Sequence, residues 1–329
     1  MISVIIPAAG VGTRLRPHTH AMPKALLPVA GRPILGHILD RLADLPELGA
    51  VRVVIGFRGD QVEQYCRTNF DYEFHFVWQQ QQRGLGHAIH LALADIPDRD
   101  QVIVILGDTI LEVDLAAFLK SGANVLGVKA VDDPRRFGVV ELNSDGTSVK
   151  RVVEKPTVPP SRLAVVGLYA IADTARLRLA LDRVVAENET TAGEIQMTDA
   201  LQYLIESGGS LRAATVDGWF DCGKFETLLQ TNRYLLDKLA TRYDINGSVV
   251  VSPCYIAPTA VIERCVIGPH VAIGRGATIT DSVIADSIVD ENAQVSRSVL
   301  RESIIGAGAV VNGQAQRLNI GGESGVALT

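Results

Sequence analysis

The last third of the chain carries an aliphatic repeat that restricts its fold more than any other feature. From Ile256 to Val311 an isoleucine, valine or leucine recurs every five or six residues over ten consecutive steps, with alanine, glycine or serine beside it. This period is typical of a parallel β-helix, in which three steps make one coil and stacked coils bury a ladder of aliphatic side chains. We therefore expect about three coils, in a domain that occupies residues 241–329 together with the tail.

The first half of the chain follows a different pattern. The apolar runs ISVIIPA, VRVVIGF, QVIVILGD and NVLGVKAV predict strands, and the segments PILGHILDRLADL and HAIHLALADI predict helices. Strands that are almost entirely apolar suit a parallel sheet with both faces covered, so we expect an α/β fold with a doubly wound, mostly parallel sheet. In such sheets ligands bind beyond the carboxyl ends of the strands. The loop after the first strand and the sequence LGDT (Leu106–Thr109) both lie at such ends.

From about residue 135 the pattern changes again. The segments FGVVELN and VKRVVEKP predict a hairpin with Asp145–Gly146 at its turn, and helices are expected near 173–187, 195–207 and 224–240. We place the end of this first, larger domain at residue 240.

Composition narrows the class of partner. The 329 residues are 47% apolar and carry a formal net charge of −6, which argues against a nucleic-acid or membrane-surface binder. The four cysteines show no paired metal spacing, which favours free thiols in a reducing compartment. No basic leader and no apolar run of the ~20 residues of a membrane helix stand in the sequence. We expect a cytoplasmic protein with no nucleic-acid or membrane partner.

The stretch PAAGVGTRLRPHTHAMPK, after the first strand, has the composition of a phosphate-binding loop. It is neither a Walker A loop nor a complete dinucleotide fingerprint. Backbone amides around Gly10 and Gly12 could bind phosphate oxygens, Arg14 could bind a phosphate bidentately, and Lys24 could supply a point charge. On these residues alone, a tight turn with solvated surface cations is an equal alternative.

A series of motifs decides between the two. The pattern G-x-G-T-R-x-x-P followed by P-K resembles the signature loop of the sugar-1-phosphate nucleotidylyltransferases. Further motifs of that family follow in order: QxxxxGLGHA from Gln79, LGDT, FGVVE, VEKP, VGLYAI, GEIQMTD and WFDCG. The likeness covers about 300 residues. It implies a Rossmann-like nucleotide-diphospho-sugar transferase domain over residues 1–240, followed by a left-handed parallel β-helix like that of the longer bacterial and archaeal members.

The family's reaction explains the positive charges. A sugar 1-phosphate oxygen attacks the α-phosphorus of a nucleoside triphosphate, and pyrophosphate leaves. Because both reactants are anions, such transfers depend on positioning and charge neutralisation. The resemblance implies that Arg14 and Lys24 bind the triphosphate and that Asp108 and Asp221 hold Mg²⁺, which takes one or two carboxylates besides phosphates and water. Each aspartate could also be an ordinary turn or cap residue.

The resemblance also implies two binding pockets. Lys155 in VEKP would hold the sugar phosphate, and Glu154 would accept hydrogen bonds from sugar hydroxyls. Gln79 would pair with a pyrimidine edge, with the register uncertain within Gln79–Gln82. The remaining nucleotide-site candidates are Ala8, Ala9, Gly10, Gly12, Thr13 and Gly84, and the remaining sugar-site candidates are Thr109, Gly138, Tyr169 and Glu194. Tyr169 could equally be a core aromatic.

The sequence leaves the substrates open. LGDT, FGVVE and the repeat resemble long glucose-1-phosphate thymidylyltransferases, whereas PAAGVGTR and GLGHAI resemble enzymes that make UDP-glucose. Thymine and uracil differ by one methyl group, so many such enzymes could use both. We place thymidylyl transfer first, uridylyl transfer second and guanylyl transfer to mannose 1-phosphate third. A non-catalytic regulatory relative and an acyltransferase activity of the β-helix are further alternatives. The flat faces of a β-helix favour a homo-oligomer, a dimer or tetramer.

Overall fold

A computed structural model describes residues 1–120, 122–188, 190–191, 193–313 and 319–327. The chain divides into two compact units. The first contains Met1–Gly10 and Ile38–Trp219, and the second contains Val11–His37 and Phe220–Thr329. Within the described residues, no helix is both long enough and apolar enough to cross a membrane.

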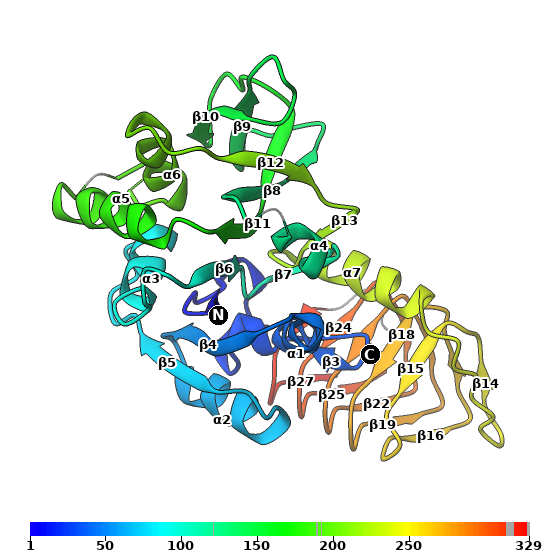
Figure 1. Cartoon of the computed structure of the whole chain (residues 1–329). Helices are drawn as coiled ribbons and strands as arrows, with labels where there is room; N and C mark the ends of the chain where they lie inside the picture. The colour runs from blue at the N-terminus through cyan, green and yellow to red at the C-terminus, as the bar shows by residue number, and fades with distance from the viewer. Residues whose placement is uncertain (121, 189, 192, 314–318, 328–329) are drawn as a thin grey trace. The chain divides into compact units, whose positions relative to one another are not determined.

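The first unit is built on a mixed sheet whose central strand order is β10-β9-β11-β6-β1-β4-β5, with β8 beside β11 and β12 beside β8 (Figure 1). The strands of this sheet are β1 (Ile2–Pro7), β4 (Leu48–Ile55), β5 (Phe74–Trp78), β6 (Gln101–Ile105), β8 (Val125–Ala130), β9 (Gly138–Leu142), β10 (Val149–Glu154), β11 (Leu163–Ile171) and β12 (Arg212–Thr215). Strand β7 (Thr109–Glu112) lies outside this sheet. Its helices are α2 (Gly59–Asn69), α3 (Leu85–Ala92), α4 (Leu115–Leu119), α5 (Thr174–Ala186) and α6 (Met197–Glu206).

One half of this sheet is parallel and the other is dominated by antiparallel pairs. Strands β6, β1, β4 and β5 run parallel, as their apolar sequences predict. Strand β11 is antiparallel to β6, β8 and β9, and β9 and β10 form the expected hairpin. The segment NVLGVKAV, expected in the parallel part, instead forms β8, which is antiparallel to β11 and parallel to β12. The predicted α/β class with a Rossmann-like sheet is confirmed.

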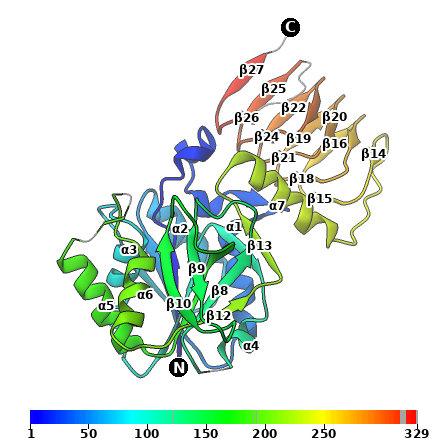
Figure 2. The same cartoon turned by 90° about the horizontal axis from the view of Figure 1, so that it is seen from above.

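Three helices cover one face of this sheet. Helices α3, α5 and α6 pack against one another, α3 lies against β1 and β4, and α6 lies against β10 (Figures 1 and 2). Their apolar residues, among them Ile89, Leu177 and Leu201, are fully buried in the same core as Val104 of β6. The helices expected near 173–187 and 195–207 are confirmed. Burial of each such aliphatic side chain contributes about 1.5–3 kcal/mol to folding.

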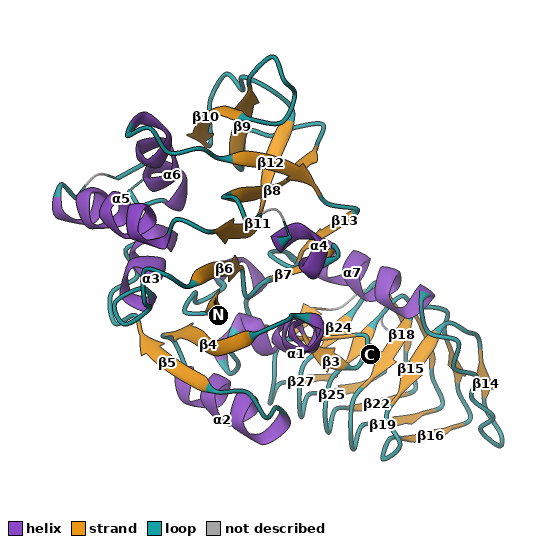
Figure 3. Cartoon of the chain, viewed as in Figure 1, coloured by secondary structure: helices purple, strands orange, loops and turns teal. Residues whose placement is uncertain are grey.

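The second unit contains the predicted β-helix (Figure 3). Its short strands form three parallel sheets, of strand orders β14-β17-β20-β23, β15-β18-β21-β24-β26 and β16-β19-β22-β25-β27. They are β14 (Val249–Val250), β15 (Cys254–Ile256), β16 (Val261–Glu263), β17 (Val266–Ile267), β18 (Val271–Ile273), β19 (Thr278–Thr280), β20 (Val283–Ala285), β21 (Ile288–Val289), β22 (Gln294–Ser296), β23 (Val299–Arg301), β24 (Ile304–Ile305), β25 (Val310–Asn312), β26 (Asn319–Ile320) and β27 (Gly325–Ala327).

The expected number of coils was too small. The described strands make four complete three-strand coils from β14 to β25, and β26 and β27 belong to a fifth. The count from sequence began at Ile256, although β14 and β15 already pair with the next coil through Val250 and Cys254. The aliphatic ladder itself is as predicted, because Ile267, Ile284 and Leu300 stack in register and are buried.

The second unit also includes a segment from the start of the chain. It holds η1 (Thr13–Leu15), η2 (His18–His20), η3 (Lys24–Leu26), β2 (Pro28–Val29) and β3 (Arg32–Pro33). Helix α7 (Phe225–Asp237) lies between this segment and the β-helix, in contact with β2 and β18. Helix α1 (Ile34–Asp40) and strand β13 (Gly218–Asp221) carry the chain from one unit to the other.

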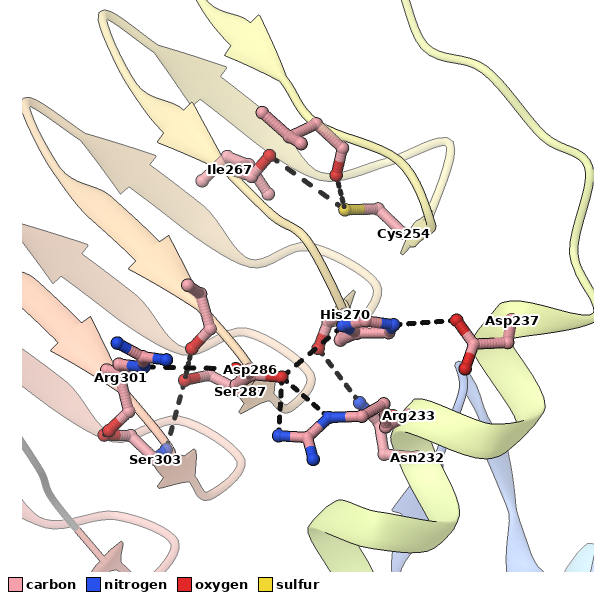
Figure 4. Close-up of polar contacts among 12 residues, drawn as sticks. Asn232, Arg233, Asp237, Cys254, Ile267, His270, Asp286, Ser287, Arg301 and Ser303 are labelled. Carbon is pink, nitrogen blue, oxygen red and sulfur yellow. Dashed lines mark hydrogen bonds and ion pairs between the residues drawn. The ribbon is translucent and has the colours of Figure 1, made fainter.

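Polar side chains of α7 join these parts. Asn232, almost fully buried, accepts a hydrogen bond from the Ala30 amide at 2.8 Å and donates one to the His270 carbonyl at 3.2 Å. Figure 4 shows the neighbouring charges. Arg233 lies 2.9 Å from Asp286, and His270 Nε2 lies 2.7 Å from the Asp237 carboxylate. The first turns of the chain, α7 and the β-helix are therefore linked by direct contacts.

The β-helix contains one buried carboxyl group that yields a test of stability. Burial raises the pKa of Asp290 to about 6, although its Oδ1 accepts a hydrogen bond from the Glu291 amide. Because the unfolded carboxyl ionises at lower pH, Asp290 costs stability as pH rises through about 6. We predict that Asp290→Asn gains stability over wild type between pH 4 and 7, by up to ~3 kcal/mol at about 1.4 kcal/mol per pKa unit. Urea unfolding across this range measures the difference.

The matched control is Glu302→Gln, at an exposed position of the same β-helix. Its stability relative to wild type is expected to stay nearly constant over the same range. A constant difference for Asp290→Asn as well would contradict the assigned pKa.

Candidate functional site

The carboxyl ends of the parallel strands bring several predicted residues of the first unit to one edge of the sheet. The Gly107 amide donates to the Pro7 carbonyl at 3.1 Å, and the Ala8 amide donates to the Val54 carbonyl at 2.8 Å. The loop after β1 therefore lies between the end of β4 and the loop after β6. Asp108 lies in the loop between β6 and β7, and its carboxylate accepts a hydrogen bond from the buried Thr109 hydroxyl at 3.2 Å.

Two glycines let these backbones approach closely. A Cβ on Gly107 would stand 2.8 Å from the Pro7 carbonyl oxygen, and a Cβ on Gly56 would stand 2.9 Å from that of Ala9. Any side chain at either position would push the Ala8–Ala9 backbone out of place. The predicted nucleotide-site residues Ala8 and Ala9 thus have a position fixed by backbone packing.

Gln79 follows β5 at the same edge. Its side chain is buried, and its amide nitrogen donates to the Gly84 carbonyl and to His87 Nδ1, both at 3.1 Å. Burial, aided by the charges of Arg83 and His90, lowers the pKa of His87, so the neutral ring can accept this hydrogen bond. The amide of Gln79 is therefore held in one orientation.

Gln82 reaches the same edge. Its amide nitrogen donates to the Ala9 carbonyl at 2.9 Å. Both ends of the Gln79–Gln82 run thus contact the loops of the predicted nucleotide site, Gln79 through a buried side chain and Gln82 through an exposed one.

Gly84 brings a second segment close. Its φ is +107°, and a Cβ there would stand 2.5 Å from the Ile195 carbonyl oxygen and 2.9 Å from Glu194 Cβ. Only glycine tolerates this backbone angle and this contact. The predicted sugar-site residue Glu194 therefore lies beside the predicted nucleotide-site residue Gly84.

Three further sugar-site candidates meet at the end of the β9–β10 hairpin. Glu154 pairs with Gly138 across the hairpin, and a Cβ on Gly138 would lie 3.2 Å from the Glu154 carboxylate. That carboxylate accepts a hydrogen bond from the Thr198 hydroxyl at 3.0 Å and lies 3.3 Å from Lys155 Nζ. Glu154 is only 10% exposed whereas Lys155 is 42% exposed, so the ammonium group can reach a ligand that the carboxylate helps to hold.

The backbone at Lys155 is unusual. Its φ is +41°, in the left-handed region that residues other than glycine rarely adopt, and its amide donates to the Phe137 carbonyl at 3.0 Å. The Phe137 ring lies edge-on to Trp219 with ring centres 4.8 Å apart. An aromatic pair thus supports the turn that presents Lys155.

Tyr169 differs from these side chains because it is buried in the core. It is 3% exposed within the main core of the first unit, and burial raises the pKa of its hydroxyl. This position suits a core aromatic residue, and a role in sugar binding stays a prediction.

The second unit holds the charged part of the predicted phosphate loop. Gly12 has φ +66°, and its carbonyl accepts hydrogen bonds from the Leu15 amide and the Thr19 hydroxyl, both at 2.9 Å. A Cβ on Gly12 would stand 3.0 Å from Lys24 Cβ, so Lys24 packs directly on this glycine. Thr13 and Arg14 are exposed on η1. The residues expected to bind phosphate therefore share one compact loop.

Asp221 ends β13 within the second unit. A Cβ on Gly223 would stand 2.7 Å from Asp221 Oδ1, so the carboxylate folds back over this glycine. Cys222 beside it is fully buried, with its sulfur 3.5 Å from the Thr231 hydroxyl, as expected for a packing residue. Within the described residues, no group of three or more His, Cys, Asp or Glu side chains is arranged to hold a metal ion.

Two residues of this site, His87 and Thr198, had no predicted role, and Gln82 was named only within the uncertain register of the base contact. Each contacts a predicted residue, and each lies in a motif that the sequence displays, namely the glutamine run, GLGHA and GEIQMTD. The motifs that contain these residues were visible in the sequence. Their individual contacts could be seen only in the structure.

Two cavities lie in the first unit, and one of them is lined by a predicted site residue. One, of about 280 Å³, is lined by Glu154 together with Thr191, Asp199 and Gln202 among others. The other, of about 570 Å³, is lined by Arg41 and carboxylates that include Asp44 and Glu112, and it contains no predicted site residue.

The fold is therefore of the α/β class, with a Rossmann-like sheet of the kind that binds ligands beyond the carboxyl ends of its parallel strands, and the chain continues into a β-helix. Comparison with known families identifies the class further. A family model described as nucleotidyl transferase matches residues 3–238. The chain belongs to this family, and the prediction that it is a nucleotidyltransferase is confirmed at that level.

Known proteins support this assignment. The low-salt glycan biosynthesis nucleotidyltransferase Agl11 of Haloferax volcanii is 33% identical over 71% of this chain. A glucose-1-phosphate thymidylyltransferase of Streptomyces griseus is 29% identical over 90% of this chain. A crystal structure of UDP-glucose pyrophosphorylase complexed with UDP-glucose is 26% identical over 73% of this chain and 100% of that chain, with a TM-score of 0.63.

The relatives differ in how much of them this chain spans. It covers 66% of the Haloferax protein and 89% of the Streptomyces protein. It covers 57% of a bifunctional protein GlmU of Methanocaldococcus jannaschii, which is 35% identical over 75% of this chain.

The close packing around Gly84 predicts the effect of one methyl group. Gly84→Ala would place a Cβ against the Ile195 carbonyl at a backbone angle of +107°. We expect a fall of at least tenfold in pyrophosphate release, because the Gln79 and Glu194 segments must move apart. Steady-state kinetics measures the loss. Gly122→Ala is the control, since its φ is +58° but its Cβ would meet open space. Equal activities for the two variants would contradict the argument.

Proposed function

We propose that the protein transfers a nucleotidyl group from a nucleoside triphosphate to a sugar 1-phosphate, releasing pyrophosphate. Thymidylyl transfer from dTTP to glucose 1-phosphate is our first choice. The observation that carries the proposal is the compact loop in which Lys24 packs on Gly12 beside the exposed Arg14. Membership of the nucleotidyl transferase family and the names of the relatives support it.

The reaction needs positive charge where two anions meet. A phosphate oxygen of the sugar 1-phosphate attacks the α-phosphorus, and the bond to the leaving pyrophosphate breaks. In this proposal Arg14 and Lys24 bind the triphosphate and neutralise charge on the leaving group. Amides of Gly10, Gly12 and Thr13 add hydrogen bonds to phosphate oxygens.

A divalent metal is part of the proposal. Asp108 and Asp221 are the proposed ligands, and Mg²⁺ typically takes only one or two carboxylates besides phosphates and water. When bound, Mg²⁺ would supply further neutralisation of phosphate charge. The carboxylate of Asp108 is preset by its hydrogen bond from Thr109.

The acceptor site is proposed at the end of the β9–β10 hairpin. Lys155 would bind the sugar phosphate, and Glu154 would accept hydrogen bonds from sugar hydroxyls. One oxygen of Glu154 already accepts a hydrogen bond from the Thr198 hydroxyl. Gly138 has no side chain that would clash with Thr198, whose Cγ2 would stand 2.7 Å from a Cβ there. Thr109, Tyr169 and Glu194 are the further candidates.

The base site is proposed at Ala8, Ala9, Gln79 and Gly84. The Gln79 amide nitrogen donates to Gly84 and His87, which leaves the amide oxygen as the atom that would accept a hydrogen bond from a pyrimidine N3–H. Uridylyl transfer is the second choice, because a solved structure of similar fold is a UDP-glucose pyrophosphorylase. Guanylyl transfer to mannose 1-phosphate, a regulatory role without catalysis, and acyl transfer by the β-helix rank below it. A cytoplasmic location also stays a prediction.

The first test is a substrate grid. Pyrophosphate release with Mg²⁺ is measured for dTTP, UTP, CTP, ATP and GTP against the 1-phosphates of glucose, mannose, galactose and N-acetylglucosamine. We expect a pyrimidine donor and glucose 1-phosphate to be the best pair. A purine donor as the best would contradict the Gln79 pocket, and no turnover with folded protein would favour the regulatory alternative.

The same assay includes variants of the charged residues. Lys24→Ala and Asp108→Asn are expected to lower turnover by ~10²-fold or more, as removal of a charge clamp or metal ligand does. Lys120→Ala and Asp71→Asn, both at exposed positions outside the site, are the matched controls. Near-normal turnover of Lys24→Ala and Asp108→Asn would contradict the roles proposed for these two residues.

Self-association is proposed through one face of the β-helix. Val249, Val266, Val283 and Val299 stack on successive coils and remain between 38% and 57% exposed, forming an apolar stripe. A second copy of the chain would bury this stripe. We predict that the double variant Val266→Glu/Val283→Glu has a lower mass in light scattering than wild type. Val261→Glu, on a neighbouring sheet, is the control, and an unchanged mass in the double variant argues against this face.

A further inference from the structure

The phosphate loop contains a buried histidine that is tied to the end of the β-helix. His18, between Arg14 and Lys24, is 5% exposed. Its Nε2 hydrogen-bonds to Oδ1 of Asn319, 301 residues further along the chain. Asn319 in turn begins β26, which pairs with β24 through Ile304 and Ile305. The last described coil therefore contacts the loop directly.

Two glycines next to Asn319 extend this contact. A Cβ on Gly321 would stand 2.9 Å from Pro17 Cβ, and a Cβ on Gly322 would stand 3.9 Å from Ala21 Cβ. Gly322 is also close to the preceding coil, because a Cβ on Gly322 would stand 3.1 Å from the Ala307 carbonyl oxygen. The segment Asn319–Gly322 thus lies between the body of the β-helix and the loop.

The contact continues from His18 to the proposed phosphate-binding residues. Thr19, which is 1% exposed, donates a hydrogen bond to the Gly12 carbonyl, and Lys24 packs on Gly12. A continuous series of contacts therefore runs from β24 through Asn319 and His18 to the loop that holds Arg14 and Lys24.

The loop has little internal support of its own. Its regular structure consists of the three-residue 3₁₀ helices η1, η2 and η3, whose hydrogen bonds are few. Ordering each residue costs about 1–2 kcal/mol, so contacts from outside the loop must offset that cost. If the loop were not held, nucleotide binding would have to select one conformation from many, and its affinity would fall by that fraction.

We propose that the segment Asn319–Gly322 positions the phosphate loop for the nucleoside triphosphate, with His18 and Asn319 as positioning residues. The inference rests on the proposed function for the roles of Arg14 and Lys24. The β-helix then acts in donor binding as well as in packing. Burial lowers the pKa of His18, which keeps the ring neutral with one N–H to donate to Asn319.

The test compares variants of the full-length chain. His18→Leu and Asn319→Leu remove the hydrogen bond, while His18→Gln keeps a donor at the same reach. Gly321→Ala pushes Pro17, and Gly325→Ala, whose Cβ would meet open space, is its matched control. We expect the first two variants and Gly321→Ala to raise KM for the nucleoside triphosphate by about tenfold, with KM for the sugar 1-phosphate within twofold of wild type. His18→Gln and Gly325→Ala are expected to match wild type.

A second measurement does not depend on turnover. Trypsin cleavage after the exposed Arg14, without nucleotide, reports how firmly the loop is held. We expect cleavage to be several times faster in Asn319→Leu and His18→Leu at unchanged melting temperature. Unchanged cleavage and KM would overturn the inference, and so would an equal rise in both KM values together with a lower melting temperature. Faster cleavage in a protein that shows no turnover would support the positioning contact while rejecting the proposed function.

Discussion

The parallel pairing of β1 with β4 and β6 is the constraint on which the first unit depends. It places the loops after β1, β4, β5 and β6 at one edge, and hydrogen bonds from Gly107 to Pro7 and from Ala8 to Val54 join them. Gly56 and Gly107 have no room for a side chain, because a Cβ at either position would stand less than 3.0 Å from a carbonyl oxygen at the end of β1 or in the loop after it. The positions of Asp108 and Gln79 at this edge follow from this backbone arrangement.

A second constraint comes from the β-helix. Its coils are stable because Ile267, Ile284 and Leu300 stack in register, and their burial contributes several kcal/mol per coil. This rigid ladder offers fixed points for flexible segments. Asn232 bonds it to Ala30, and Asn319 bonds it to His18. A loop made of short 3₁₀ turns can thus keep a single conformation although its own hydrogen bonds are few.

Periodic features of the fold could be predicted from the sequence. The apolar strands, the helices α5 and α6, the Asp145–Gly146 hairpin and the aliphatic ladder all follow from local pattern. Helix α2 was not predicted. Its buried residues are only Gly59, Val62 and Cys66, which is too few for a recognisable apolar period. The antiparallel position of β8 was also missed, since an apolar strand carries no record of its neighbour's direction. The count of coils was too small because β14 precedes the regular part of the repeat, which begins at Ile256 in β15.

The predicted site shows where local pattern stops being informative. Motif spacing indicated Gln79, Glu154 and Lys155, yet the contacts that orient them come from His87, Thr198 and Phe137. Contacts of this kind depend on which elements the sheet brings together, and a hydrogen bond across 301 residues, as between His18 and Asn319, leaves no trace in periodicity. Charged residues at the start of a chain can be recognised by their motif. What holds them in a binding conformation is decided by packing, and here the holding residues lie at the opposite end of the sequence.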